Sequence, residues 1–172
     1  MAPYPPARDR QRQRCRGAHT DVAVPPASLD RGRSDQISGA CVDGRWRSQI
    51  QDFTVNHLKA DLHADFLAVP GGIEPLTLFD LVPKDFNFLR RRLEALIASH
   101  GTKRIVAIAH QDCAWYRKNV RFPFTLDLRE RQLRDLTRVA VRLRETFPSM
   151  AVETYFARLS GSSPERVVFE TV

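Results

Sequence analysis

The chain has 172 residues, which corresponds to one domain at about 100–200 residues per domain. Hydrophobic residues make up 42% and charged residues 27%, as in soluble globular proteins, and no run approaches the roughly 20 apolar residues of a membrane span. With no apolar run of the kind found in secretory signals, these features argue against membrane-spanning, secreted and collagen-like classes.

The cysteine count indicates a cellular compartment, and the charge distribution sets the first residues of the chain apart. Three cysteines, Cys15, Cys41 and Cys113, are an odd number and do not form the pattern of a disulfide framework. We therefore expect a cytoplasmic protein, in which reduced thiols are available for a metal or for catalysis. The net charge is +7, and seven arginines against four aspartates place +3 of it in residues 1–35.

Residues 1–35 are predicted to form a disordered basic arm. Five of the eleven prolines lie there and large apolar side chains are nearly absent, so the segment cannot bury enough surface to offset its ordering entropy. Arginines alternate along residues 8–16, a pattern that fits an arm for nucleic acid or an anionic membrane. A solvated tail, or residues added by an upstream start codon, is the commoner explanation of such a cluster.

Apolar runs then alternate with helical patterns along the rest of the chain. Strands are expected at 36–42, 65–69, 104–109, 151–159 and 166–172, and helices at 46–62, 86–100 and 126–147. Residues 104–109 (RIVAIA) are almost all apolar, which is typical of a strand buried on both faces. We therefore predict one α/β domain over 36–172, with a mainly parallel β-sheet flanked by helices.

Two of the predicted strands run into residues that bind metals. The first runs into Cys41-Val42-Asp43-Gly44-Arg45, and the buried one into His110-Gln111-Asp112-Cys113. Ligands gather at the carboxyl ends of strands in open α/β sheets, so neighbouring strands would bring Cys41, His110 and Cys113 together. Two thiolates and one imidazole are an ordinary zinc set. Taken singly, each cysteine is equally well a small buried apolar residue.

Together these two motifs resemble those of the β-class carbonic anhydrases, which carry Cys-x-Asp-x-Arg and later His-x-x-Cys. The approach LEALIASHGTKRIVAIAHQDC is also similar to that family's approach to its second motif, and the resemblance covers about 36–172. It implies a β-carbonic-anhydrase-like fold, zinc on Cys41, His110 and Cys113, and Asp43 with Arg45 as the catalytic pair. It also implies carbon dioxide and bicarbonate as substrates, and a homo-oligomer such as a dimer.

Two of the departures from the family pattern lie in short segments near the candidate ligands. Val69-Pro70-Gly71-Gly72 stands where the family has Asn-Ala-Gly-Asn, and Ala114 replaces the glycine that follows the last ligand. Between the ligands, Asp112 either orients one of them or is a turn residue. Trp115 and Tyr116 either line a pocket or pack in the core.

Three functions are compatible with this sequence. The leading one is the zinc-dependent, reversible hydration of carbon dioxide, in which Asp43, fixed by Arg45, accepts a hydrogen bond from the attacking group. If Arg45 releases Asp43, that carboxylate can instead become a fourth zinc ligand and close the site. The second is hydrolysis of a related molecule such as carbonyl sulfide or carbon disulfide. The third is a non-catalytic, zinc-stabilised binding protein whose arginine arm contacts nucleic acid or another anion.

The arm gives the first prediction. Deleting residues 1–33 should leave the melting temperature and the zinc content nearly unchanged, because a segment of this composition contributes little buried surface. Thermal unfolding and metal analysis of the full-length and truncated chains provide the test. A large loss of stability would mean that the arm packs against the domain or across an oligomer.

Overall fold

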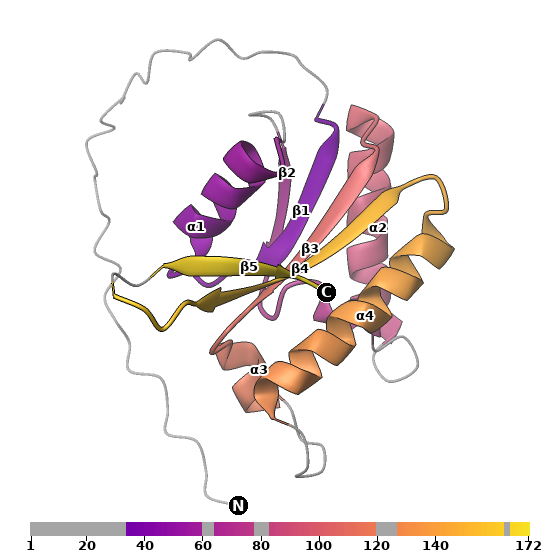
Figure 1. Ribbon diagram of the computed structural model, residues 1–172. Helices are drawn as coiled ribbons and strands as arrows, with labels where there is room; N and C mark the ends of the chain where they lie inside the picture. The colour runs from indigo at the N-terminus through magenta and orange to yellow at the C-terminus, as the bar shows by residue number, and fades with distance from the viewer. Residues whose placement is uncertain (1–33, 60–63, 78–82, 120–126, 164–165) are drawn as a thin grey trace, which may run out of the picture. The chain divides into compact units, whose positions relative to one another are not determined.

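The computed structural model describes residues 34–59, 64–77, 83–119, 127–163 and 166–172 (Figure 1). The chain divides into two units, Met1–Arg31 and Gly32–Val172, and every described residue lies in the second. The predicted arm, residues 1–35, therefore lies outside the described residues except at its end. There Ser34 is buried, and the Asp35 carbonyl accepts hydrogen bonds from the backbone N–H groups of Lys103 and Arg104.

A five-stranded sheet forms the centre of the domain, with strand order β2-β1-β3-β4-β5. The first four strands in this order pair in parallel, and β5 pairs with β4 antiparallel. This confirms the α/β class and the mainly parallel sheet. The strands are β1 (Gln36–Cys41), β2 (Asp65–Val69), β3 (Arg104–His110), β4 (Ala151–Leu159) and β5 (Val167–Thr171).

Helices connect the strands as expected for parallel crossovers, with two differences from the sequence prediction. The helices are α1 (Arg47–Asp52), η1 (Phe53–His57), η2 (Glu74–Thr77), α2 (Pro83–His100), α3 (Ala114–Asn119) and α4 (Leu128–Thr146). The helix expected over 46–62 changes to a π-helix at Phe53, where the Leu58 N–H bonds the Phe53 carbonyl. The short α3 and η2 were not predicted, because so few residues give no readable period. Within the described ranges, no helix is long and apolar enough to cross a membrane.

Side chains alternate between the two faces of the sheet, and each face has its own core. Ile37, Ile105 and Ala107 point to the face that packs against α2 and α4. Ala40, Val106 and Ile108 point to the face covered by α1 and η1, which lie on the other side of the sheet in Figure 1. As predicted, β3 is therefore buried on both faces.

The pairing of β1 with β3 brings the candidate metal ligands at the ends of these strands together. The two strands run in parallel and in register from Gln36 opposite Arg104 to Ala40 opposite Ile108. Both strands end at the same edge of the sheet just beyond this last pair, β1 at Cys41 and β3 at His110. Cys41 and His110 thus meet although 69 positions separate them in the sequence.

Candidate metal centre

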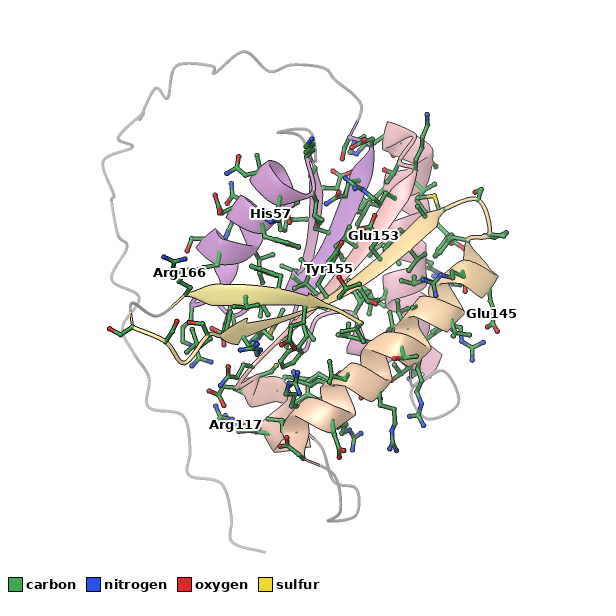
Figure 2. All side chains as sticks on the ribbon, viewed as in Figure 1. His57, Arg117, Glu145, Glu153, Tyr155 and Arg166 are labelled. Carbon is green, nitrogen blue, oxygen red and sulfur yellow. The ribbon has the colours of Figure 1, made fainter. Side chains whose placement is uncertain are left out.

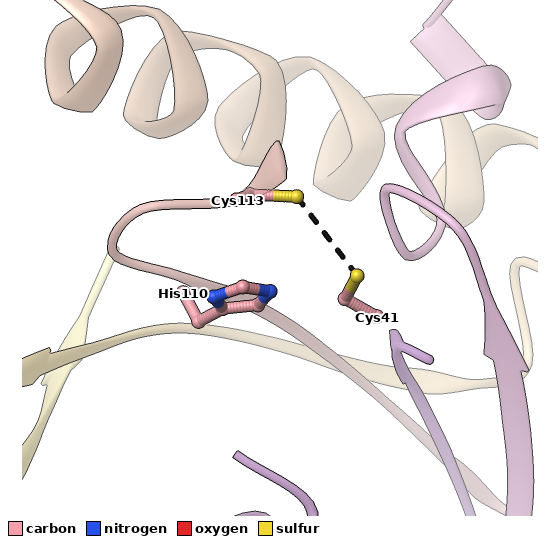
Figure 3. A group of neighbouring side chains, drawn as sticks. All are labelled: Cys41, His110 and Cys113. Carbon is pink, nitrogen blue, oxygen red and sulfur yellow. Dashed lines mark hydrogen bonds between the residues drawn. The ribbon is translucent and has the colours of Figure 1, made fainter. Parts of the chain in front are cut away.

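Cys41, His110 and Cys113 form a compact group at the carboxyl edge of the sheet (Figure 3). Their three candidate ligand atoms all lie within 4.8 Å of one another, and the two sulfurs are 3.9 Å apart. His110 and Cys113 are buried, whereas Cys41 is partly exposed. This geometry lets the group hold one metal ion, as the sequence spacing predicts.

The turn between His110 and Cys113 owes its shape to Asp112. This residue has φ +58, in the left-handed region that a non-glycine residue adopts at a cost. Its carbonyl oxygen accepts hydrogen bonds from Arg45 Nη2 at 3.4 Å and from Arg117 Nη2 at 3.1 Å; Arg117 lies on α3 (Figure 2). Asp112 is therefore a turn residue whose backbone is held from both sides.

The hydrogen bonds of His110 indicate which ring nitrogen is available. Its Nδ1 lies 2.7 Å from the Gln111 carbonyl oxygen, and because a carbonyl only accepts, Nδ1 carries the proton. The other nitrogen, Nε2, is buried and has no hydrogen-bond partner among the described residues. A buried polar atom without a partner is rare in folded proteins, and metal-binding histidines commonly donate their second N–H in this way. Nε2 is thus well suited to bind a metal.

The two thiols share a hydrogen bond that shifts their pKa values in opposite directions. The contact with Cys113 lowers the pKa of the Cys41 thiol, against the effect of burial, and the neighbouring His110 lowers it further. The same contact, together with burial, raises the pKa of Cys113. Of the two thiols, that of Cys41 is therefore the easier to deprotonate, and a metal ion would displace thiol protons as it binds.

Asp43 and Arg45 form a close ion pair beside the metal-capable group. Arg45 Nη2 lies 2.6 Å from Asp43 Oδ2, and Arg45 Nε lies 3.0 Å from Oδ1. The Arg45 backbone N–H also donates to Oδ1 at 3.1 Å. These bonds lower the pKa of Asp43 to about 2, so the carboxylate is ionised throughout the neutral range.

A cleft of about 410 Å³ opens directly beside Cys41. It is lined by Cys41, Val42, Asp43, Pro70, Ala114, Trp115 and Lys118. Trp115 lies at its wall and is 37% exposed, whereas Tyr116 is buried. Of the two predicted aromatic residues, one therefore lines a pocket and the other packs.

Gly71 lets the turn after β2 lie against Trp115 of the cleft wall, a contact that the sequence did not indicate. It has φ +79, and a Cβ there would lie 2.3 Å from Trp115 Cδ1, closer than any real contact. The Pro70-Gly71-Gly72 turn and Trp115 therefore fit together only because residue 71 lacks a side chain. The Gly-Gly pair in the sequence signals a turn, but not which side chain lies against it.

This contact gives the second prediction. Gly71→Ala should destabilise the fold more than Gly161→Ala. Both glycines have positive φ, and a side chain in that region costs about 1–2 kcal/mol, but only Gly71 has a neighbour that must move. Urea unfolding of the two variants measures the difference. Equal losses would show that Trp115 does not depend on residue 71.

Comparisons with known proteins place the chain in a family. The family model described as "Putative carbonic anhydrase" matches residues 36–164, which is the greater part of the chain. In sequence, no curated protein matches it. The chain is similar in structure to the carbonic anhydrase from Glaciozyma antarctica, with 15% identity, a TM-score of 0.44, and coverage of 77% of this chain and 81% of that one.

Two further solved structures give comparable values. The carbonic anhydrase from Streptococcus mutans shows 16% identity and a TM-score of 0.45, covering 80% of this chain and 82% of that one. A structure of two tetrameric beta-carbonic anhydrases from Sordaria macrospora shows 12% identity and a TM-score of 0.43, covering 82% and 83%. The family match rests on the sequence of 36–164, which includes both ligand motifs. The chain therefore belongs to the carbonic anhydrase family that this model describes.

Proposed function

We propose that this protein catalyses the zinc-dependent, reversible hydration of carbon dioxide to bicarbonate. The observation that carries the proposal is the convergence of Cys41, His110 and Cys113, with the unpartnered Nε2 of His110 among them. The family match and the Asp43–Arg45 pair support it. The expected homo-oligomer and the cytoplasmic location stay predictions.

The donor set fits zinc, for which two cysteine sulfurs and one histidine nitrogen are ordinary ligands. Such a set leaves a fourth position for a small molecule. When bound there, zinc supplies Lewis acidity that lowers the pKa of water toward about 7. The two sulfurs, once both are deprotonated, offset the charge of the ion, which makes the surrounding hydrogen-bond acceptors more important.

Asp43 is the acceptor that the geometry offers. It lines the cleft beside Cys41, and Arg45 binds both of its carboxylate oxygens. With its pKa at about 2, Asp43 is too weak a base to keep a proton near neutral pH. We assign it the role of accepting a hydrogen bond from the attacking water and so turning that oxygen's lone pair toward carbon dioxide. Arg45 orients the carboxylate and lowers its basicity further.

The residues that line the cleft suit both the uncharged substrate and the anionic product of the proposed reaction. Val42, Pro70 and Trp115 give apolar surface, which accepts an uncharged molecule such as carbon dioxide. Lys118 supplies a positive charge at the same cleft, which favours the anionic product. Carbonyl sulfide and carbon disulfide are apolar as well, so the same assays should include them.

Metal content is the third prediction. Purified protein should carry about one zinc per chain, because three sulfur and nitrogen ligands lie within reach of one ion. Cys41→Ser and Cys113→Ser should lose the metal, and Cys15→Ser should retain it. Elemental analysis of freshly prepared protein that has not met a chelator measures this. Absence of zinc from the wild type would contradict the proposal.

The fourth prediction concerns the ion pair. Arg45→Lys should keep the zinc but lower carbon dioxide hydration about 10- to 100-fold, because lysine cannot bind both carboxylate oxygens in one plane. Asp43→Ala should lower it about 100-fold or more. Stopped-flow hydration assays at equal zinc content provide the measurement.

Arg47→Lys is the matched control for this experiment. Arg47 is exposed at the start of α1, so the same exchange there should leave the rate unchanged. A wild-type protein that holds zinc but shows no hydration above background would instead support the zinc-stabilised binding protein. Turnover of carbonyl sulfide or carbon disulfide without hydration would support the hydrolase.

A further inference from the structure

A buried glutamine interrupts the apolar face of α4. The buried positions of this helix include Leu136, Val139, Ala140 and Leu143, whose spacing defines the face turned to the sheet. Gln132 continues the same face and is only 1% exposed. Burying an amide costs free energy unless it is hydrogen-bonded. A buried Gln132 therefore needs a hydrogen bond that offsets this cost.

Gln132 bonds the backbone of a candidate metal ligand. Its Nε2 donates to the His110 carbonyl oxygen at 2.9 Å. The pairing of β1 with β3 ends at Ala40 and Ile108, so β1 offers no strand partner at the level of His110. The side chain of Gln132 supplies the donor that the sheet no longer provides.

The other end of the same peptide, the Gln111 N–H, is fixed as well. The backbone N–H of Gln111 donates to the Ala157 carbonyl at 2.8 Å, and its side-chain Oε1 accepts from the Leu159 N–H at 3.0 Å. The Gln111 carbonyl is the acceptor of His110 Nδ1. Gln132 and β4 thus hold, from its carbonyl and its N–H, the peptide that joins His110 to Gln111, and the His110 ring bonds the carbonyl of the following peptide.

The same face of α4 also reaches α3, the helix that begins directly after Cys113. Asp135, three residues after Gln132, is buried and hydrogen-bonded by the side chain of Tyr116 on α3. The backbone N–H of Tyr116 in turn bonds the sulfur of Cys113. One helix therefore contacts the supports of both His110 and Cys113.

We infer that Gln132 is a positioning residue of the metal centre: through the His110 carbonyl, α4 sets the direction in which His110 Nε2 meets the ion. The inference rests on the zinc site of the proposed function, but not on the reaction catalysed there. Removing the amide should tilt the ring and weaken metal binding while the fold persists.

The test compares Gln132→Met with Val139→Ala in the full-length chain. Methionine keeps the length of the side chain without its donor, and Gln132→Asn keeps the amide but shortens the chain by one methylene. Val139 is buried on the same face of α4, so its truncation destabilises the helix packing without touching the His110 carbonyl. Zinc affinity is measured by competition with a chromophoric chelator, and the ligand geometry by the visible spectrum of the cobalt-substituted protein.

We expect both Gln132 variants to bind zinc about 10-fold more weakly or worse and to change the cobalt spectrum, as lost supports of metal ligands commonly do. Val139→Ala should keep the wild-type affinity and spectrum despite a lower melting temperature. Unchanged affinity and spectrum in both Gln132 variants would overturn the inference even if the wild type hydrates carbon dioxide. A wild type that binds zinc without hydration would overturn the proposed function alone. A wild type that binds no zinc would overturn both.

Discussion

The parallel pairing of β1 with β3 is the constraint on which the rest of the site depends. Each strand contributes one end of the metal-capable group, and their register brings both ends to one edge of the sheet. Because β3 is buried on both faces, neither strand can slip by one residue without moving its side chains from one core to the other and disrupting the packing of both. The hydrophobic effect that stabilises the sheet therefore also fixes the distance between Cys41 and His110.

Among the described residues, the polar groups around the centre leave one buried nitrogen of His110 without a hydrogen-bond partner. Two thiols share a hydrogen bond that favours an anion on Cys41, and the Nε2 of His110 lies buried without a partner. Arg45 binds Asp43, and Arg45 and Arg117 both donate to the Asp112 carbonyl. A half-buried thiolate beside a buried nitrogen whose lone pair is unused is costly, and a divalent cation removes both costs at once. This links the electrostatics of the group to its proposed metal.

Several parts of this arrangement follow from residue patterns. The continuous apolar run of 104–109 predicts a doubly buried strand, and the spacing of His110 and Cys113 predicts a turn that presents both to one ion. The Asp43–Arg45 pair lies two residues apart and forms the contact expected of it. The change to a π-helix at Phe53 could not be anticipated, because the helical spacing of apolar residues continues through it. There Phe53 stacks on Phe169 of β5 with ring centroids 3.9 Å apart, a contact between segments distant in sequence.

The sequence by itself determined the alternation of strands and helices, which depends on local periodicity, and it offered the candidate ligands through two short motifs at strand ends and their resemblance to a known family. Only the tertiary structure decided that Gly71 lies against Trp115 and that Gln132 supports His110, since these contacts join residues 44 and 22 positions apart. A glycine or a glutamine carries no local signal of its distant partner. Close packing and the requirement that buried polar groups be bonded select such partners, and both act only when the chain has folded.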